Sequence, residues 1–272
     1  MRIPRVLAAC LLAACAGACD VHVDKGGGLS VDLARGKATE EWRRTYTLPA
    51  GGTLDLVNVN GPIEAGPAAG PQVEVVVRRE AEAPSDQAAR ELLQKAGIVE
   101  EVAPERVRIE AGAASGGRRG GIFGGSRLET RFEVRVPDGL TVSLKTENGA
   151  IQVGGFKGRL TASSTNGGIT GRSLRGATRV STVNGGVRLA FDAIGGDIEA
   201  TTVNGSIRVE LPPAAGGMLL ATTVNGSVTV DERLRFRASE RERLRMAGTL
   251  NDGGPAITLS TTNGGVRVSA AN

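Results

Sequence analysis

The sequence repeats the dipeptide Asn-Gly seven times, and each copy stands in the same short pattern, which we call the Asn-Gly motif. An apolar β-branched residue follows three positions after every Asn. A Thr or Ser precedes the Asn by two positions in six copies, and Asn58 takes that place in the first copy. The motifs are Asn60-Gly61, Asn148-Gly149, Asn166-Gly167, Asn184-Gly185, Asn204-Gly205, Asn225-Gly226 and Asn263-Gly264.

The spacing of the motifs is nearly regular. From Asn148 onward the intervals are 18, 18, 20, 21 and 38 residues, and the last is close to two of the others. A fixed period of this length is typical of solenoid proteins, in which each repeat is one structural unit that stacks on the next. The sequence therefore predicts an all-β fold, namely a single-chain, β-helix-like β-solenoid built from Asn-Gly repeats of about 19 residues.

The composition agrees with a solenoid. The chain has 40 glycines and only 3% aromatic residues, which is a poor supply for a conventional globular core. In a solenoid each coil packs only on its neighbours, so short aliphatic side chains can fill a thin interior. After the motifs, aliphatic residues alternate with polar ones, which places Arg188, Arg208 and Arg267 on the solvent face of their strands.

The motif residues suit sharp turns between strands. Asn tolerates a left-handed backbone and Gly adopts it freely, so we expect the pair to turn the chain in this way. In stacked coils, each Asn amide is expected to hydrogen-bond to the backbone of the next coil. The Thr two positions earlier is expected on the same strand face as the Asn, where successive threonines would form a row of hydroxyls.

The N-terminus has the pattern of an export signal. Arg2 and Arg5 precede a short apolar run that ends at Ala14 and is too short to span a bilayer. Leu12-Ala13-Ala14-Cys15 is typical of a bacterial lipobox, so we predict lipid modification at Cys15, with Cys19 as the alternative. A cleaved secretory signal without a lipid is a further alternative, and the choice between inner and outer membrane stays open.

These features divide the chain into four segments. We predict a signal peptide at 1–14, a lipid-anchored flexible tether at 15–41, an opening β coil at 42–138 and the β-solenoid repeats at 139–272. The opening coil is expected to contain one short helix near residues 85–96 and a Gly-rich hairpin loop from Gly112 to Gly125. The long last interval, Asp231 to Met246, is interpreted as an extended β-excursion, with a short helix as the alternative.

The residues that common enzyme classes need are scarce. His22 is the only histidine and lies in the predicted tether, so a Ser-His or Cys-His pair has no base in the repeats. The repeats contain neither Cys nor His for a transition metal. Asp192, Asp197 and Glu199 are the nearest approach to a carboxylate cluster, and they keep a β-helical carbohydrate-active enzyme as an alternative. We predict a non-enzymatic protein without a metal or other cofactor.

The repeated unit Thr202-Val203-Asn204-Gly205-Ser206-Ile207-Arg208-Val209 resembles that of a β-strand-repeat family of bacterial envelope proteins known as "putative adhesins", a domain of unknown function. The likeness covers residues 45–270. It implies a single-chain β-solenoid, an exported location and no established enzymatic activity. This chain has Gly, Ser, Ala or Pro after the motif where the family's usual form has Asp, so its turn surface is less acidic.

Charge and location together suggest a function. The net charge of +4 permits attraction to anionic surfaces. We predict an envelope lipoprotein, lipid-anchored to a membrane and facing the periplasm or cell surface, that presents a rigid β-solenoid for adhesion or interaction. An anionic polysaccharide or an envelope protein is the expected partner. Nucleic acid is not expected as a partner, because the basic residues lack interleaved stacking aromatics.

The alternative functions are a self-assembling scaffold with exposed terminal coils and an ice- or mineral-binding array on the motif threonines.

Overall fold

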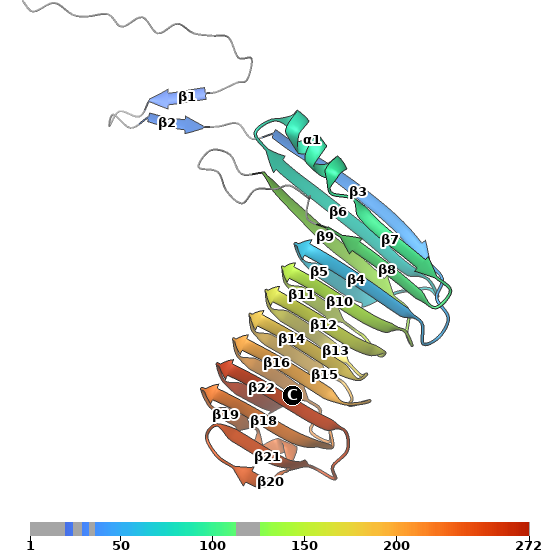
Figure 1. The fold of residues 1–272 in the computed structure, drawn as a ribbon. Coiled ribbons are helices and arrows are strands. Elements are labelled where there is room, and N and C mark those ends of the chain that lie inside the picture. Colours follow the sequence, from blue (N-terminus) through green and yellow to red (C-terminus); the bar gives the residue numbers. More distant parts are fainter. Residues whose placement is uncertain (1–19, 24–28, 33–35, 113–125, 272) are drawn as a thin grey trace, which may run out of the picture.

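The computed structural model describes residues 20–23, 29–32, 36–112 and 126–271. The predicted all-β architecture is confirmed. Two large sheets face each other, one of eleven strands (sheet I) and one of ten (sheet II), and a small separate sheet pairs β1 (Asp20–Val23) with β2 (Leu29–Asp32). Figure 1 shows the strands of both large sheets stacked in one elongated, solenoid-like body.

Each coil of the solenoid contains one strand in sheet I, which ends at the motif Asn, and the following strand in sheet II. The coil strands of sheet I are β4 (Thr53–Asn60), β10 (Thr141–Asn148), β12 (Arg159–Asn166), β14 (Thr178–Asn184), β16 (Ile198–Asn204), β18 (Gly217–Asn225) and β22 (Ala256–Asn263). Their partners in sheet II are β5 (Ile63–Pro67), β11 (Ile151–Gly154), β13 (Ile169–Leu174), β15 (Val187–Phe191), β17 (Ile207–Leu211), β19 (Val228–Val230) and β23 (Val266–Ala270).

Neighbouring coils pair in parallel with each motif Asn opposite the next, as at Asn166 and Asn184. Alternate side chains of both sheets point between them and form the core, where Leu144, Ile151 and Ile207 are almost fully buried. This is the two-residue period expected for strands with one buried face. A one-residue slip would turn the aliphatic residues outward, so burial holds the register.

The coils do not stack in sequence order at the C-terminal end. Strand β22 pairs with β16 on one side and with β18 on the other, and β23 lies between β17 and β19. The last coil in the sequence is therefore the penultimate coil in space. The 38-residue interval before Asn263 is not two stacked units, because the chain first builds the terminal coil and then returns to fill the gap beside it.

The long interval also closes the end of the solenoid. After a 3-10 turn, η1 (Glu232–Leu234), strands β20 (Phe236–Arg241) and β21 (Arg245–Leu250) form an antiparallel hairpin that pairs with β18. The predicted β-excursion is thus present, with one short 3-10 turn before it. Leu234 of the 3-10 turn and Leu250 of the hairpin are fully buried. In sheet II the edge strand β19 has three residues, which leaves little backbone for pairing with another chain.

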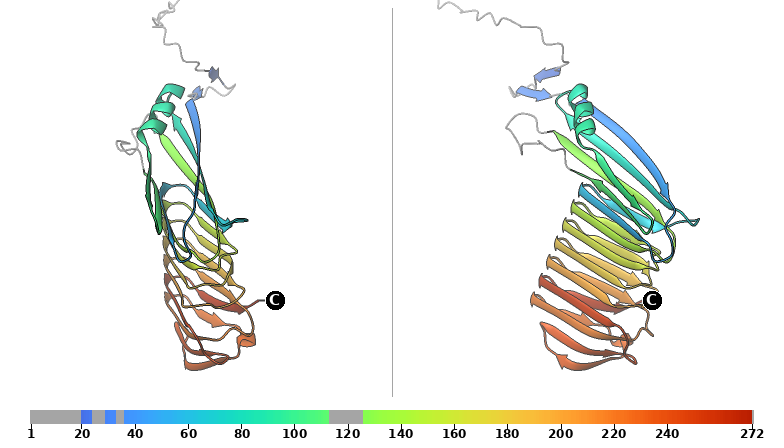
Figure 2. Two further views of the ribbon diagram at one scale, coloured as in Figure 1. Left: turned by 90° about the vertical axis from the view of Figure 1, so that its right-hand side faces the viewer. Right: turned by 45° about the vertical axis from the view of Figure 1, so that its right-hand side comes forward.

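At the opposite end, the strands of sheet II are longer than those of the coils. Sheet II continues through β9 (Arg127–Val136), β6 (Val73–Ala83) and β3 (Gly36–Tyr46), and sheet I through β8 (Arg106–Ala111) and β7 (Ile98–Ala103). Figure 2 shows these strands extending beyond the coils, with the helix against them.

The predicted helix is observed as α1 (Asp86–Lys95). The Ser85 hydroxyl accepts a hydrogen bond from the Ala88 backbone N–H at 3.2 Å, as an N-cap does. Buried Ala89 and Leu93 pack against Ala81 and Ala83 of β6. The helix therefore covers the part of the long strands that sheet I does not reach.

The start of the fold differs from the sequence interpretation. Strand β3 begins at Gly36, so residues 36–41, assigned above to the tether, belong to sheet II, where they pair with the far end of β6. The predicted signal peptide, Cys15, Cys19 and nearly all of the predicted loop from Gly112 to Gly125 lie outside the described residues. In the part of the chain that is described, no helix has the length and hydropathy that a membrane span requires.

The insertion of the last coil generates a prediction. Removal of residues 253–272 takes away β22 and β23, which join the terminal coil to the rest of the solenoid. We expect amides in residues 217–250 to lose protection by at least about tenfold in hydrogen–deuterium exchange, because their parallel partner is gone. Amides in residues 141–189 serve as the internal control and should stay protected. Unchanged protection of residues 217–250 would contradict the inserted topology.

Candidate interaction surface

The seven motif asparagines form one continuous, exposed row, which we call the asparagine ladder. Six of the seven donate a hydrogen bond from the amide Nδ2 to the side-chain Oδ1 of an adjacent Asn at 2.8 to 2.9 Å, and Asn60, at the end of the row, only accepts. In space the order is Asn60, Asn148, Asn166, Asn184, Asn204, Asn263 and Asn225. The expectation that each amide would bond to the backbone of the next coil is therefore wrong, because the in-register amides reach each other first.

The motif glycines are required for a reason that the sequence interpretation missed. Of the seven, only Gly61 and Gly264 have a positive φ between 20° and 160°, and no motif Asn has one. A Cβ on Gly205 would instead lie 2.0 Å from the carbonyl oxygen of Gly185 in the next coil, and the other stacked motif glycines meet the same obstacle. The predicted left-handed turn is thus wrong for most copies. Gly is needed because stacked turns approach too closely for any side chain.

The motif threonines point into the protein. The Thr202 hydroxyl donates to the Gly185 carbonyl oxygen at 2.9 Å, and Thr182 donates to Gly167 at 2.8 Å. Thr202 is only 1% exposed. In the first copy the Asn58 amide donates to the Thr130 carbonyl oxygen of the neighbouring strand at 2.7 Å and to Gly61 of its own turn at 3.0 Å. The motif threonines do not share the exposed face of the Asn, and their burial excludes them as an ice- or mineral-binding array.

Because the stacked turns approach so closely, adding a single methyl group at a motif glycine is expected to destabilise the fold. Gly205→Ala is expected to lower the free energy of unfolding by about 1–3 kcal/mol, since the added Cβ overlaps a backbone carbonyl that cannot move aside. Gly154→Ala is the control, because its Cβ would meet nothing within 4 Å. Urea denaturation of both variants provides the comparison. Equal stabilities would argue against the steric role of the motif glycine.

The burial of Thr202 predicts that substitutions at Thr202 and at its neighbour Thr201 differ in their effect on stability. Thr202→Val keeps the side-chain shape but leaves the Gly185 carbonyl without its hydroxyl donor, which should cost about 1–3 kcal/mol. Thr201→Val alters an outward-facing side chain on the same strand and should change stability by less than about 0.5 kcal/mol. Thermal unfolding distinguishes them. A similar midpoint for both variants would show that the hydroxyl bond contributes little.

Of the three candidate catalytic acids, Asp197 and Glu199 line one groove together with Arg179, whereas Asp192 is not among the residues that line it. Asp192 pairs with Arg175 at 3.2 Å, and Glu199 pairs with Arg179 at 2.8 Å. Asp197 accepts a hydrogen bond from the Ala256 backbone N–H at 3.0 Å. Each carboxylate thus has a different local partner. Among the residues that the structure describes, no three His, Cys, Asp or Glu side chains lie together in a way that could hold a metal ion.

The outer face of sheet II carries a row of arginines that form no ion pair within the described chain. Arg188, Arg208 and Arg267 lie directly opposite one another on β15, β17 and β23, and we call them the arginine row. All three are exposed, and within the described chain none forms an ion pair within 4 Å. Neighbouring strands are about 4.8 Å apart, so the row concentrates three like charges that an anionic partner would neutralise.

Towards the N-terminal end of the same face, several arginines are paired with carboxylates. Glu41 pairs with Arg43 and with Arg78, and hydrogen bonds from these two guanidinium groups lower the pKa of the Glu41 carboxyl. Glu133 also contacts Arg78, and Glu64 lies 3.8 Å from Arg131. Several arginines near the N-terminal end of this face are therefore paired with carboxylates, whereas the arginine row on the later coils is not.

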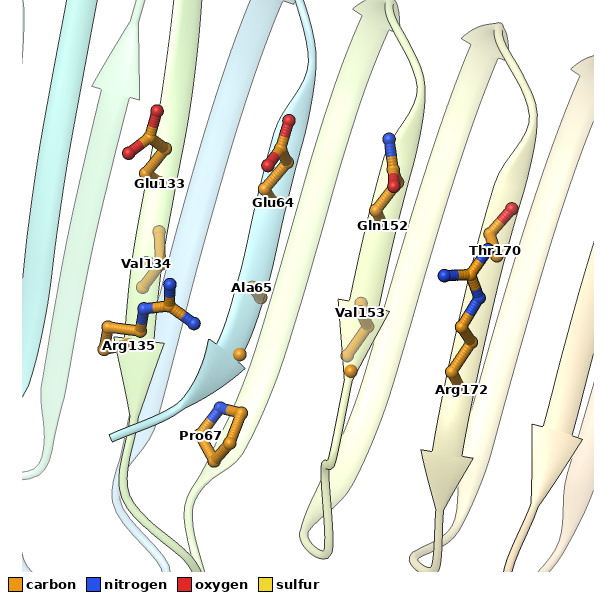
Figure 3. Close-up of a pocket in the computed structure, with 12 residues that line it drawn as sticks. Glu64, Ala65, Pro67, Glu133, Val134, Arg135, Gln152, Val153, Thr170 and Arg172 are labelled. Atoms are coloured by element: carbon orange, nitrogen blue, oxygen red, sulfur yellow. The ribbon is translucent and has the colours of Figure 1, made fainter. Parts of the chain in front are cut away.

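A groove of about 290 Å³ opens on this face between the two regions. Arg135 of β9 and Arg172 of β13 stand on either side of it, with the short strands β5 and β11 between them (Figure 3). No local sequence pattern predicted this groove. Its walls come from strands distant in the chain, and the signal available was the small residue Gly at equivalent places in β5 and β11.

In-register coils with two strands each, closed by a hairpin and carrying exposed rows of identical side chains, define a β-solenoid-like protein. Residues 105–269 match the model of the Toastrack DUF4097 family, and the chain belongs to that family. The family resemblance expected from the sequence is confirmed.

A search of the curated proteins finds no match. Among solved structures, one similar chain is a "putative cell adhesion protein" from Clostridium sporogenes, with 11% identity, a TM-score of 0.45, and coverage of 86% of this chain and 100% of that one. A "putative adhesin" from Bacteroides fragilis has 10% identity, a TM-score of 0.40, and coverage of 85% and 97%. With TM-scores below 0.5 and identities of 10% and 11%, these two structures support no conclusion about function.

Proposed function

We propose that this protein is a non-enzymatic lipoprotein of the bacterial cell envelope whose rigid β-solenoid binds an anionic polysaccharide. The observation that carries the proposal is the arginine row, three exposed and unpaired guanidinium groups in register on one sheet face. Arg presents several N–H donors in a fixed plane, which suits carboxylate and phosphate groups. The stacked strands hold the three charges at a constant spacing, so a linear polyanion can contact them together.

The location in the envelope is part of the proposal. A charged start, a short apolar run and the lipobox-like sequence before Cys15 support export and lipid anchoring, with Cys19 as the alternative lipidated residue. Strand β3 begins at Gly36, and the coils that carry the arginine row lie away from that end of the fold (Figure 1). An anchor at the N-terminus would thus leave the arginine row free to meet a partner.

A self-assembling scaffold is the second candidate function. The observation in its favour is the edge strand β7, on which Val99 and Val102 are 56% and 62% exposed. Its Glu100 and Glu101 disfavour pairing of two such edges, as charged residues on edge strands do. The hairpin at the other end of the solenoid also covers the surface on which a second copy would stack. Analytical ultracentrifugation of the protein alone tests this candidate, because a scaffold would self-associate with rising concentration.

The arginine row predicts the outcome of a co-sedimentation experiment with polygalacturonate. The triple variant Arg188→Ser, Arg208→Ser, Arg267→Ser should bind at least about tenfold more weakly at low salt, and binding of the unaltered protein should weaken as salt screens the charges. Stability should be nearly unchanged, because all three side chains are exposed.

The matched control removes the same charge elsewhere. Arg90→Ser, Arg159→Ser, Arg241→Ser changes three exposed arginines on α1, β12 and β20. It should bind nearly as well as the unaltered protein if the arginine row is the binding surface. An equal loss of binding in both triple variants would show that only the net charge of the protein matters. If the unaltered protein does not bind polygalacturonate, the proposed function is overturned.

A further inference from the structure

We propose that the groove between Arg135 and Arg172 binds the acidic group of one sugar residue in an anionic glycan. This inference rests on the proposed function and names the place where such a polymer would be held specifically. The groove lies on the outer face of sheet II, over β9, β5, β11 and β13. The arginine row attracts negative charge in general, whereas the groove has a shape and a set of hydrogen-bonding groups of its own.

Missing side chains create the groove. Gly66 of β5 and Gly154 of β11 occupy outward positions where other coils carry Arg172, Ala190, Glu210 or Ser269. A Cβ on Gly66 would lie 2.5 Å from Nη1 of Arg135, so the guanidinium group rests over this glycine. A Cβ on Gly154 would meet nothing within 4 Å, which places open space above β11.

The two arginines supply the charge for an anion. Both are exposed, and within the described residues neither forms an ion pair within 4 Å. Glu74 lies opposite Arg135 in the pairing of β6 with β9, yet the two side chains are not paired either. An acidic group between the guanidinium groups could accept charge-assisted hydrogen bonds from both, which are stronger than bonds between neutral groups.

The groups beside the arginines suit sugar hydroxyls. Gln152 and Thr170 line the groove on β11 and β13, and Glu64 and Glu133 line it on β5 and β9 (Figure 3). Amide and hydroxyl groups donate and accept, and carboxylates accept from hydroxyl donors. A ligand with one acidic group and several hydroxyls meets both sets of partners. A membrane surface would not, since a flat array of headgroups cannot reach a floor between raised side chains.

The groove and the arginine row form one continuous track. Thr170 in the groove lies opposite Arg188, the first member of the row, and Arg208 and Arg267 follow on the next strands. A glycan chain held by one residue in the groove could therefore continue across the strands along the solenoid. The spacing of the guanidinium groups is then set by the strand spacing of about 4.8 Å.

Isothermal titration calorimetry tests the groove with three small probes. Trigalacturonate offers carboxylates on a sugar, inorganic phosphate offers the alternative acidic group, and maltotriose is the neutral control. We expect saturable binding of trigalacturonate and none of maltotriose. In Arg135→Gln, Arg172→Gln, binding should weaken roughly tenfold to a hundredfold, because two charge-assisted hydrogen bonds are removed. Binding of phosphate alone, lost in the same variant, would support the site with a phosphate-bearing glycan as its source.

A second variant keeps all the charges. Gly154→Leu fills the groove from a position with free space, and Gly97→Leu is its control, because a Cβ there also meets nothing within 4 Å. Binding should be lost in the first variant and retained in the second, with similar unfolding temperatures in both. Failure of the small acidic probes to bind, or undiminished binding in the two groove variants, would overturn the inference. If the groove variants still sediment with polygalacturonate while the arginine-row variant does not, the groove fails and the proposed function stands.

Discussion

The contact on which this structure depends is the approach of one turn to the next, where the carbonyl oxygen of a motif glycine occupies the space that a Cβ would need on its neighbour. This approach brings the motif asparagines within hydrogen-bonding distance and places each inward Thr hydroxyl on the same carbonyl. One small residue thus permits two side-chain hydrogen bonds per coil. Because a buried carbonyl without a donor is costly, the threonine and the glycine are required together.

The ends of a solenoid need a different solution, because a bare last coil exposes unpaired backbone. Here the chain builds the terminal coil early, covers it with the β20–β21 hairpin and then inserts its own last coil beside β16. Asp231 helps to fix this path: its carboxylate accepts from the backbone N–H of Arg233 at the excursion and from that of Ala270 in the last strand. The C-terminal segment therefore joins the cap to the repeats.

Strict register converts small sequence differences into surface features. Positions that are opposite in the sheet form columns, so three successive arginines give a charged row and two successive glycines give a groove. The inward positions of the same strands remain mostly aliphatic. Core and surface can therefore vary independently in this fold, which allows a common scaffold to carry different binding faces.

The sequence by itself determined the period, the inward and outward faces and the helix at Ser85, because these depend on local spacing and on the chemistry of single residues. It also placed Arg188, Arg208 and Arg267 in solvent. Only the tertiary structure decided the order of the coils. The sequence of β22 is compatible with pairing to β16, to β18 or to both, and in the structure it pairs with both. The tertiary structure likewise decided why glycine is needed and where the groove lies. Arg135 and Arg172 line the same groove only because β5 and β11, which separate them, carry Gly66 and Gly154 at the positions between the two arginines, and contacts between strands distant in the chain leave no local signal.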